Sequence, residues 1–133
     1  MTHTFTLRVY YEDTDMAGIV YYANYLRYIE RARSEAVRDV GIEQLSMRDD
    51  DGVVFVVRGM QIEYLRPARF DDVLTIETET TALKAATMQM FQTVKRGDEV
   101  VFTADVRVAC MGLDGRPARY PAEIRQKLAL LQG

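Results

Sequence analysis

NYLRYIERARSEAVRDV, residues 24–40, is the longest stretch of the chain with one uniform periodicity. Apolar residues recur in it three or four positions apart, which is the spacing of one face of an α-helix. This face comprises Leu26, Ile29, Ala32, Ala36, Val37 and Val40. Asn24 is of a type that caps a helix start, and Gly41 is of the type that ends a helix. We therefore predict one long helix, whose apolar face needs a sheet to cover it.

On either side of this helix the pattern changes to that of strands. Phe5, Leu7 and Val9 alternate with polar residues, which predicts a half-buried strand before the helix. A polar loop at 47–52 is followed by four further strand-like runs, at 53–64, 72–82, 87–95 and 99–111. A short helix is predicted at 122–131. Short turns join the strands, so we predict an α+β fold with a five-stranded antiparallel sheet against one helix. Without an internal repeat or linker, residues 1–133 are expected to form a single domain.

The composition excludes several classes of function. The chain is 48% hydrophobic and 28% charged with a net charge of -3, so it lacks the basic surface that binds nucleic acid. No apolar run is long enough to span a bilayer, and residues 1–4 lack the features of a signal peptide. We expect a cytoplasmic protein without a membrane span.

Two residue types that often carry catalysis are nearly absent. His3 is the only histidine, and we expect it in a frayed segment or at the start of a strand. Cys110 is the only cysteine, and its neighbours predict a buried strand and a core thiol. These counts argue against Ser-His-Asp, Cys-His and metal sites, so proton chemistry falls to a carboxylate, a lysine or a tyrosine.

YEDTDMAGIVYYANY, residues 11–25, resembles the signature loop and helix start of the hot-dog-fold acyl-CoA thioesterases. The resemblance is strongest to the 4-hydroxybenzoyl-CoA thioesterase type and to the Tol-Pal-associated acyl-CoA thioesterases. It continues in the same order through YIERAR (28–33), EYLRPA (63–68) and DDVL (71–74), and so covers most of the chain.

This resemblance implies a five-stranded antiparallel sheet wrapped around one long central helix. It also implies a homodimer or homotetramer with acyl-CoA sites between subunits and with no cofactor or metal. The catalytic carboxylate of the family maps to Asp15, and the backbone N-H that polarises the thioester carbonyl maps to Tyr22. Tol-Pal-associated members often have histidine at the Tyr22 position, so the acyl group could be short, long or aromatic.

These residue types suit thioester hydrolysis. Such a reaction needs a nucleophile or base beside the carbonyl, and hydrogen-bond donors where its oxygen becomes negative. An aspartate is ionised at neutral pH, so Asp15 is expected to attack the thioester or to activate water. Gly18 lets the backbone approach a ligand, and the free N-H groups near Tyr22 can receive the oxyanion.

The remaining expected contacts are with the substrate's two ends. Gly18, Ile19, Val20 and Tyr25 are candidates for substrate contact, and Tyr22 and Tyr25 are the candidates for the lining of the acyl pocket, with a core or interface position as the alternative. CoA phosphates need clustered positive charge, for which Arg58, Arg66, Arg69 and Lys84 are candidates. Lys84 is the first choice, because the aromatic-acyl type carries a basic cluster in that turn.

Structural roles compete with some of these assignments. Asp13 is expected to brace the loop. Glu30 and Glu35 could add a second carboxylate, but we expect them to be solvated or to pair with arginines of the same helix. A hot-dog dehydratase or hydratase is an alternative enzyme, but it would need a histidine and His3 is badly placed for that role. The alternative from another class is a non-catalytic module that binds acyl-CoA or acyl-carrier protein.

Overall fold

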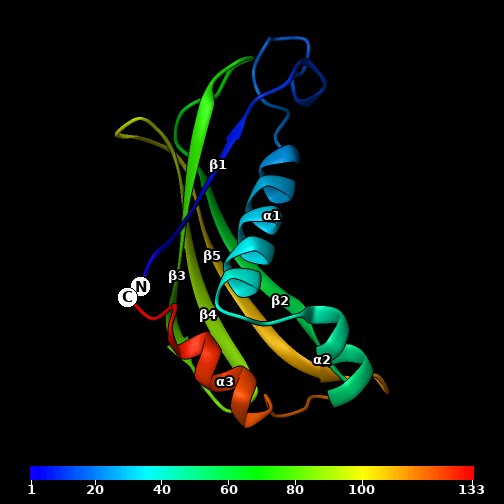
Figure 1. The fold of residues 1–133 in the computed structure, drawn as a ribbon. Coiled ribbons are helices and arrows are strands. Elements are labelled where there is room, and N and C mark those ends of the chain that lie inside the picture. Colours follow the sequence, from blue (N-terminus) through cyan, green and yellow to red (C-terminus); the bar gives the residue numbers. More distant parts are fainter.

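The computed structural model describes residues 1–133 as one five-stranded antiparallel sheet with three α-helices and one short 3-10 helix, Tyr11–Asp13 (Figure 1). The sheet order is β1-β3-β4-β5-β2. The strands are β1 (His3–Arg8), β2 (Val53–Tyr64), β3 (Val73–Leu83), β4 (Thr87–Arg96) and β5 (Glu99–Gly112). The helices are α1 (Asn24–Asp39), α2 (Gln44–Asp51) and α3 (Ala122–Ala129). The predicted α+β class, strand number and strand positions are confirmed.

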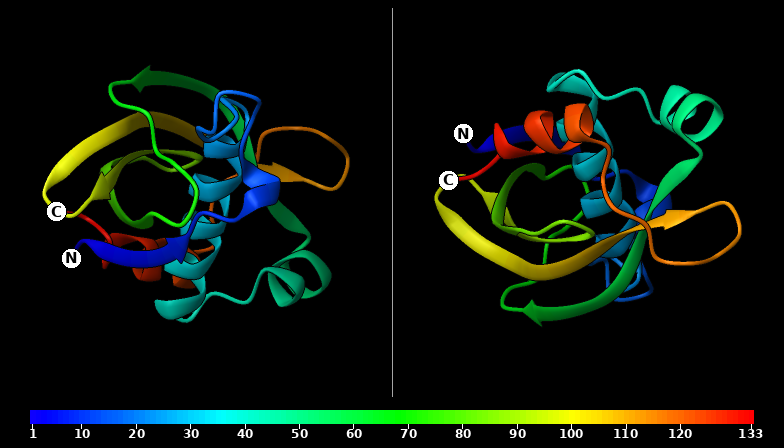
Figure 2. Two further views of the ribbon diagram at one scale, coloured as in Figure 1. Left: turned by 90° about the horizontal axis from the view of Figure 1, so that it is seen from above. Right: turned by 90° about the horizontal axis from the view of Figure 1, so that it is seen from below.

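Helix α1 lies in the curve of the sheet, and the views from above and below show the strands arching around it (Figure 2). Its sheet-facing side is fully packed, with Ile29, Ala32 and Ala36 each 0% exposed. Strands β3 and β4 alternate regularly between buried and half-buried residues, as a sheet with one covered face does. Bulges between Val57 and Gly59 in β2 and between Thr80 and Ala82 in β3 help the sheet bend.

One buried polar group joins the helix to the sheet. Gln92 of β4 is 0% exposed, and its Nε2 donates to the carbonyl oxygen of Ile29 (2.9 Å) and to Thr78 Oγ1 (3.0 Å). Its Oε1 accepts a hydrogen bond from Arg33 Nη1 at 3.0 Å. Since a buried amide is stable only when its hydrogen bonds are made, this contact sets how α1 lies on the strands.

Two local predictions are wrong. Residues 47–52 are not a polar loop, because α2 covers Gln44–Asp51; only Met47 of this helix is buried, so its sequence carries little periodicity. Asn24 does not cap α1, because it is the first helical residue and its side chain turns back to an earlier carbonyl. Gly41 follows the helix end with a φ of 94°, as predicted.

The two ends of the sheet carry different loops. Residues 9–23, the 65–72 connection and the β4–β5 turn lie at one end, which we call the Asp15 end (Figure 1). The β3–β4 turn, α2 and α3 lie at the opposite end, which we call the far end. The three helices are each too short or too polar to cross a bilayer.

Candidate active site

The loop before α1 folds back on itself and is tied to the helix start. The Asp13 carbonyl oxygen accepts hydrogen bonds from the Tyr21 N-H (2.8 Å) and from Asn24 Nδ2 (2.8 Å). Further along, the Asp15 N-H donates to the Ile19 carbonyl oxygen at 2.9 Å. The Asp13 carboxylate also accepts the Tyr10 N-H at 2.8 Å, which is the bracing role expected of it. Asp15 is therefore held at a fixed place beside the helix start.

Asp15 occupies the first position of a tight turn. Its carbonyl oxygen accepts the Gly18 N-H at 3.0 Å, and its Oδ1 accepts the Ala17 N-H at 2.9 Å. Gly18 has a φ of 78°, a conformation that side chains with a Cβ disfavour. The Asp15 side chain is exposed, and its second carboxylate oxygen has no partner in the chain. It is thus free to act on a ligand.

The start of α1 presents unoccupied donors. The backbone N-H groups of Tyr22 and Ala23 donate to no backbone carbonyl, and no side chain caps this helix. Its first turn also contains no acidic residue that would compensate the positive end of the dipole. The peptide unit between Tyr22 and Ala23, which carries the Ala23 N-H, is held from its other side, because Tyr64 Oη donates to the Tyr22 carbonyl oxygen at 2.9 Å. These donors can receive a developing negative charge.

Of the expected substrate contacts in this region, Gly18 is exposed and Ile19 is partly exposed, whereas Val20 and Tyr25 are both 3% exposed. Tyr22, the other candidate for the acyl pocket, is 63% exposed. The Tyr25 ring stacks on Phe102 with 4.8 Å between ring centroids, and its hydroxyl accepts the Ala68 N-H at 3.2 Å. Burial raises the pKa of Tyr25 above its ordinary value. The structure therefore places Tyr25 in the core under the site and not on its surface.

The expected phosphate contacts are dispersed within one chain. Arg66 and Arg69 are exposed at the Asp15 end, and Ile19 forms a β-bridge with Arg69. Arg58 is exposed at the β2 bulge, and Lys84 lies in the β3–β4 turn at the far end. A single chain thus places Arg66 at the same end as the Asp15 loop, joins Arg69 to that loop and leaves Lys84 apart from it.

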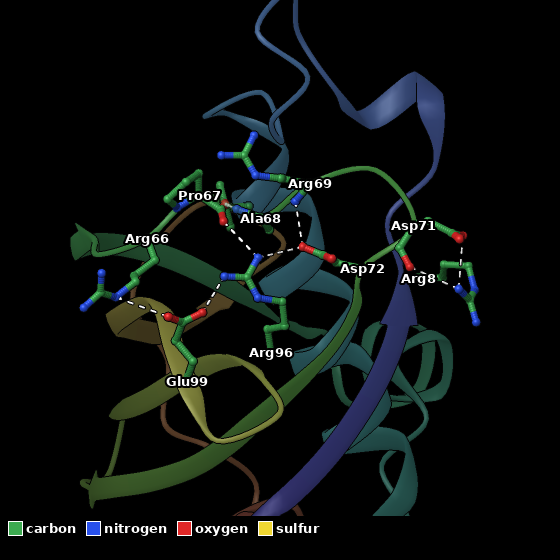
Figure 3. Close-up of polar contacts among 10 residues, drawn as sticks. Arg8, Arg66, Pro67, Ala68, Arg69, Asp71, Asp72, Arg96 and Glu99 are labelled. Atoms are coloured by element: carbon green, nitrogen blue, oxygen red, sulfur yellow. Dashed lines mark hydrogen bonds and ion pairs between the residues drawn. The ribbon is translucent and has the colours of Figure 1, made fainter.

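An ion-pair cluster that the sequence did not reveal holds the 65–72 connection (Figure 3). Arg96, at the end of β4, donates through Nη1 to the Pro67 carbonyl oxygen (3.1 Å) and to Asp72 Oδ2 (2.8 Å). Its Nη2 pairs with Glu99, which also lies 3.4 Å from Arg66 Nε. Burial opposes the charge on Asp72, but the Arg69 N-H and the Arg96 guanidinium outweigh it and lower the pKa of Asp72. No periodic pattern could have identified this cluster, since its members meet only in the fold.

A profile of the Thioesterase-like superfamily matches residues 9–128, which is most of the chain. The chain belongs to this superfamily. An acyl-CoA thioesterase named YbgC from Haemophilus influenzae is 39% identical over 123 residues, covering 92% of this chain and 90% of that protein. The hot-dog fold and the thioesterase resemblance predicted from residues 11–25 are confirmed.

Solved structures of superfamily members agree with this placement. A probable thioesterase from Bartonella henselae is 40% identical with a TM-score of 0.86. The match covers 91% of this chain and 100% of that one. A 4-hydroxybenzoyl-CoA thioesterase mutant, with asparagine in place of an aspartate, was solved in complex with 4-hydroxybenzoyl-CoA. It is 26% identical with a TM-score of 0.90, covering 96% of this chain and 98% of that one.

The histidine and cysteine of this thioesterase-superfamily chain lie away from Asp15. His3 begins β1 and is 8% exposed, and its Nε2 lies 2.7 Å from Asp39 Oδ2 at the end of α1. Cys110 is buried in β5, and burial raises the pKa of its thiol. Of the two positions expected for His3, a frayed segment or the start of a strand, the structure has the second. Cys110 is a core thiol, as predicted.

The turn at Gly18 makes a testable prediction. A Cβ added at this position meets no atom within 4 Å, so only its φ of 78° resists substitution. We expect Gly18→Ala to lower the free energy of unfolding by about 1–2 kcal/mol, and Gly18→Asn to cost less because asparagine tolerates this conformation. Urea unfolding measures both variants. Equal losses for alanine and asparagine would contradict the turn described here.

Proposed function

We propose that this chain hydrolyses acyl-CoA thioesters to a free acid and CoA. The observation that carries the proposal is that the loop with the free carboxylate of Asp15 is hydrogen-bonded, through the Asp13 carbonyl oxygen, to residues at the uncapped start of α1. The superfamily membership supports it, as does the name of the Haemophilus relative. Further support comes from the related mutant structure, in which an asparagine replaces an aspartate and the thioester substrate is bound.

The chemistry follows from these two features. The thioester carbonyl oxygen accepts the Tyr22 N-H, so negative charge that develops on it is stabilised by the helix start. Asp15 either attacks the carbonyl carbon, giving an acyl anhydride that water then hydrolyses, or takes a proton from the water that attacks. In both routes the C-S bond breaks and CoA leaves as the thiol after gaining a proton. Both routes need the same carboxylate in the same place.

The chain by itself leaves this site open, and we propose that a second copy closes it. Strand β2, which is 12 residues long, is an edge of the sheet and pairs only with β5. It carries half-exposed apolar residues such as Val57, which is 42% exposed, and a long apolar edge is a ready template for pairing. Antiparallel pairing of β2 with its counterpart sets the Asp15 end of one copy beside the far end of the other. This gives a homodimer, and two dimers can make a homotetramer.

The same pairing gives roles to the dispersed residues. Arg66 and Arg69 flank the Asp15 loop of their own chain, whereas Arg58 and Lys84 approach the site from the second copy. A cavity of about 190 Å³ lies between α1 and β2, with Phe55, Val57 and Met90 among its walls. The polar side chains Glu30, Arg33, Ser34 and Gln44 line the rest of the cavity, so its apolar part is what can receive a compact acyl group. We propose that it receives the acyl group of the substrate bound by the partner's Asp15 loop.

Three wider features belong to the same proposal. We propose that residues 1–133 act as one domain, because the core cluster extends from Val9 to Leu131. Acyl-CoA is the proposed substrate and acyl-carrier protein a second candidate partner, since both present an acyl thioester. The cytoplasm is the proposed compartment, where acyl-CoA is made and a free thiol such as Cys110 stays reduced.

The role of Asp15 is tested by conservative substitution. We expect Asp15→Asn to lower kcat on a panel of short, long and aromatic acyl-CoAs by about 10²–10⁴-fold, because the amide can neither attack nor accept a proton. Glu12→Gln is the matched control, since Glu12 is exposed in the same loop and makes no hydrogen bond there. Binding of the esters without turnover by the wild type would favour the non-catalytic module instead.

The proposed subunit contact is tested by placing charge on the β2 edge. We expect Val57→Asp to give a monomer by light scattering, because each copy then carries a charge on the apolar edge that the pairing buries. Activity falls as well, but Val57 also lines the cavity proposed for the acyl group, so the oligomeric state is the deciding measurement. Val73→Asp is the control, because Val73 is equally exposed, at 43%, but lies on an inner strand. An active wild-type monomer would refute the shared site.

A further inference from the structure

We infer that Arg96 is a positioning residue, which holds the Asp15 loop in its working geometry without touching the substrate. This inference rests on the proposed function, because it concerns the same loop. It comes from a continuous set of hydrogen bonds that starts at the end of β4 and reaches the turn at Asp15 through the 65–72 connection.

The first step is the grip of Arg96 on residues 67–69 (Figure 3). The guanidinium binds the Pro67 carbonyl oxygen directly. It also binds Asp72 Oδ2, and this same oxygen accepts the Arg69 N-H at 2.8 Å. One planar group with fixed donor directions thus sets the position of the backbone on both sides of Ala68.

The second step is the hold of residues 68 and 69 on the Asp15 loop. The Ala68 carbonyl oxygen accepts the Val20 N-H at 2.8 Å, while the Ala68 N-H donates to Tyr25 Oη in the first turn of α1. Ile19 forms its β-bridge with Arg69. Ala68 is 0% exposed, so these bonds are shielded from water. The Asp15 loop and the start of α1 are therefore both hydrogen-bonded to residues 68–69, the segment that Arg96 holds in place.

The connection also contains a strained residue. Asp71 has a φ of 73° and is the only residue other than glycine with a positive φ. Such a conformation persists only where the surroundings impose it, and it is common near functional sites. Two ion pairs hold this part of the chain. Arg96 pairs with Asp72, the next residue, and Arg8 forms a more exposed pair with Asp71 itself at 3.1 Å. Arg8 binds Asp71 but none of residues 67–69, so it provides a natural comparison.

The cluster is better suited to placing atoms than to stabilising the whole fold. The side chains of Arg96 and Asp72 are 33% and 24% exposed, and ion pairs in contact with water contribute little to global stability. A small displacement of a reacting group, in contrast, slows catalysis strongly. Loss of Arg96 is therefore expected to appear in kcat before it appears in the melting temperature.

The test compares Arg96→Met, Arg96→Lys and Arg8→Met in the full-length protein. We expect Arg96→Met to lower kcat about 10–100-fold with KM changed less than about threefold, because the loop is displaced while substrate contacts remain. Arg96→Lys restores part of the loss, since it keeps the charge and one donor. Arg8→Met stays near the wild type.

Amide hydrogen exchange provides a readout that does not depend on activity. Removal of Arg96 is expected to speed exchange of the Asp15, Gly18 and Val20 amides, while removal of Arg8 is not. Unchanged exchange in Arg96→Met, or a rise in KM equal to the fall in kcat/KM, would overturn the inference. Failure of the proposed function has a different result: the wild type would not hydrolyse any ester of the panel, even with the loop amides protected.

Discussion

The apolar face of α1 must be buried, and this requirement organises the rest of the molecule. A helix with Ile29, Ala32 and Ala36 in contact with strands can only lie in the curve of the sheet, where Gln92 fixes its position by hydrogen bonds. The helix start is then confined to one end of the sheet. The 65–72 connection and the β4–β5 turn end at the same place, so the groups that surround the helix start come from three separate parts of the chain.

At this end the structure departs from what stability alone favours. The helix start has no side-chain cap, Asp15 is exposed with an unused oxygen, Asp71 has a positive φ, and aromatic residues such as Tyr22 are open to solvent. Departures of this kind from local rules are expected at functional sites. They are tolerated because hydrogen bonds at Asp13 and Ala68 hold the surrounding backbone. In the proposed function, the same features that weaken the local structure supply the reacting carboxylate and the donors for the oxyanion.

Most of the fold was predictable because the spacing of apolar residues along the chain differs between helices and strands. The 24–40 helix was placed within a residue of its observed end, since α1 buries one face along its length. The strand at 53–64 was placed at its observed ends from its run of strand-forming residues, although only Val53 of β2 is buried. The α2 helix was missed because it buries only Met47. Asp15 and Tyr22 were identified by a resemblance of the loop, and their roles stay proposals. Arg96 was missed because its importance depends on Pro67 and Asp72, which are distant in sequence, and the separation of Lys84 from Asp15 depends on strand order.

The central claim is that one thioester carbonyl is held between Asp15 and the start of α1. A crystal structure of the Asp15→Asn variant with an intact acyl-CoA tests it most directly. The account predicts the thioester oxygen within about 2.7–3.1 Å of the Tyr22 backbone nitrogen, with the substituted side chain next to the carbonyl carbon and the acyl group in a cavity of the second copy. A thioester bound elsewhere, with the Tyr22 N-H facing only solvent, would contradict it.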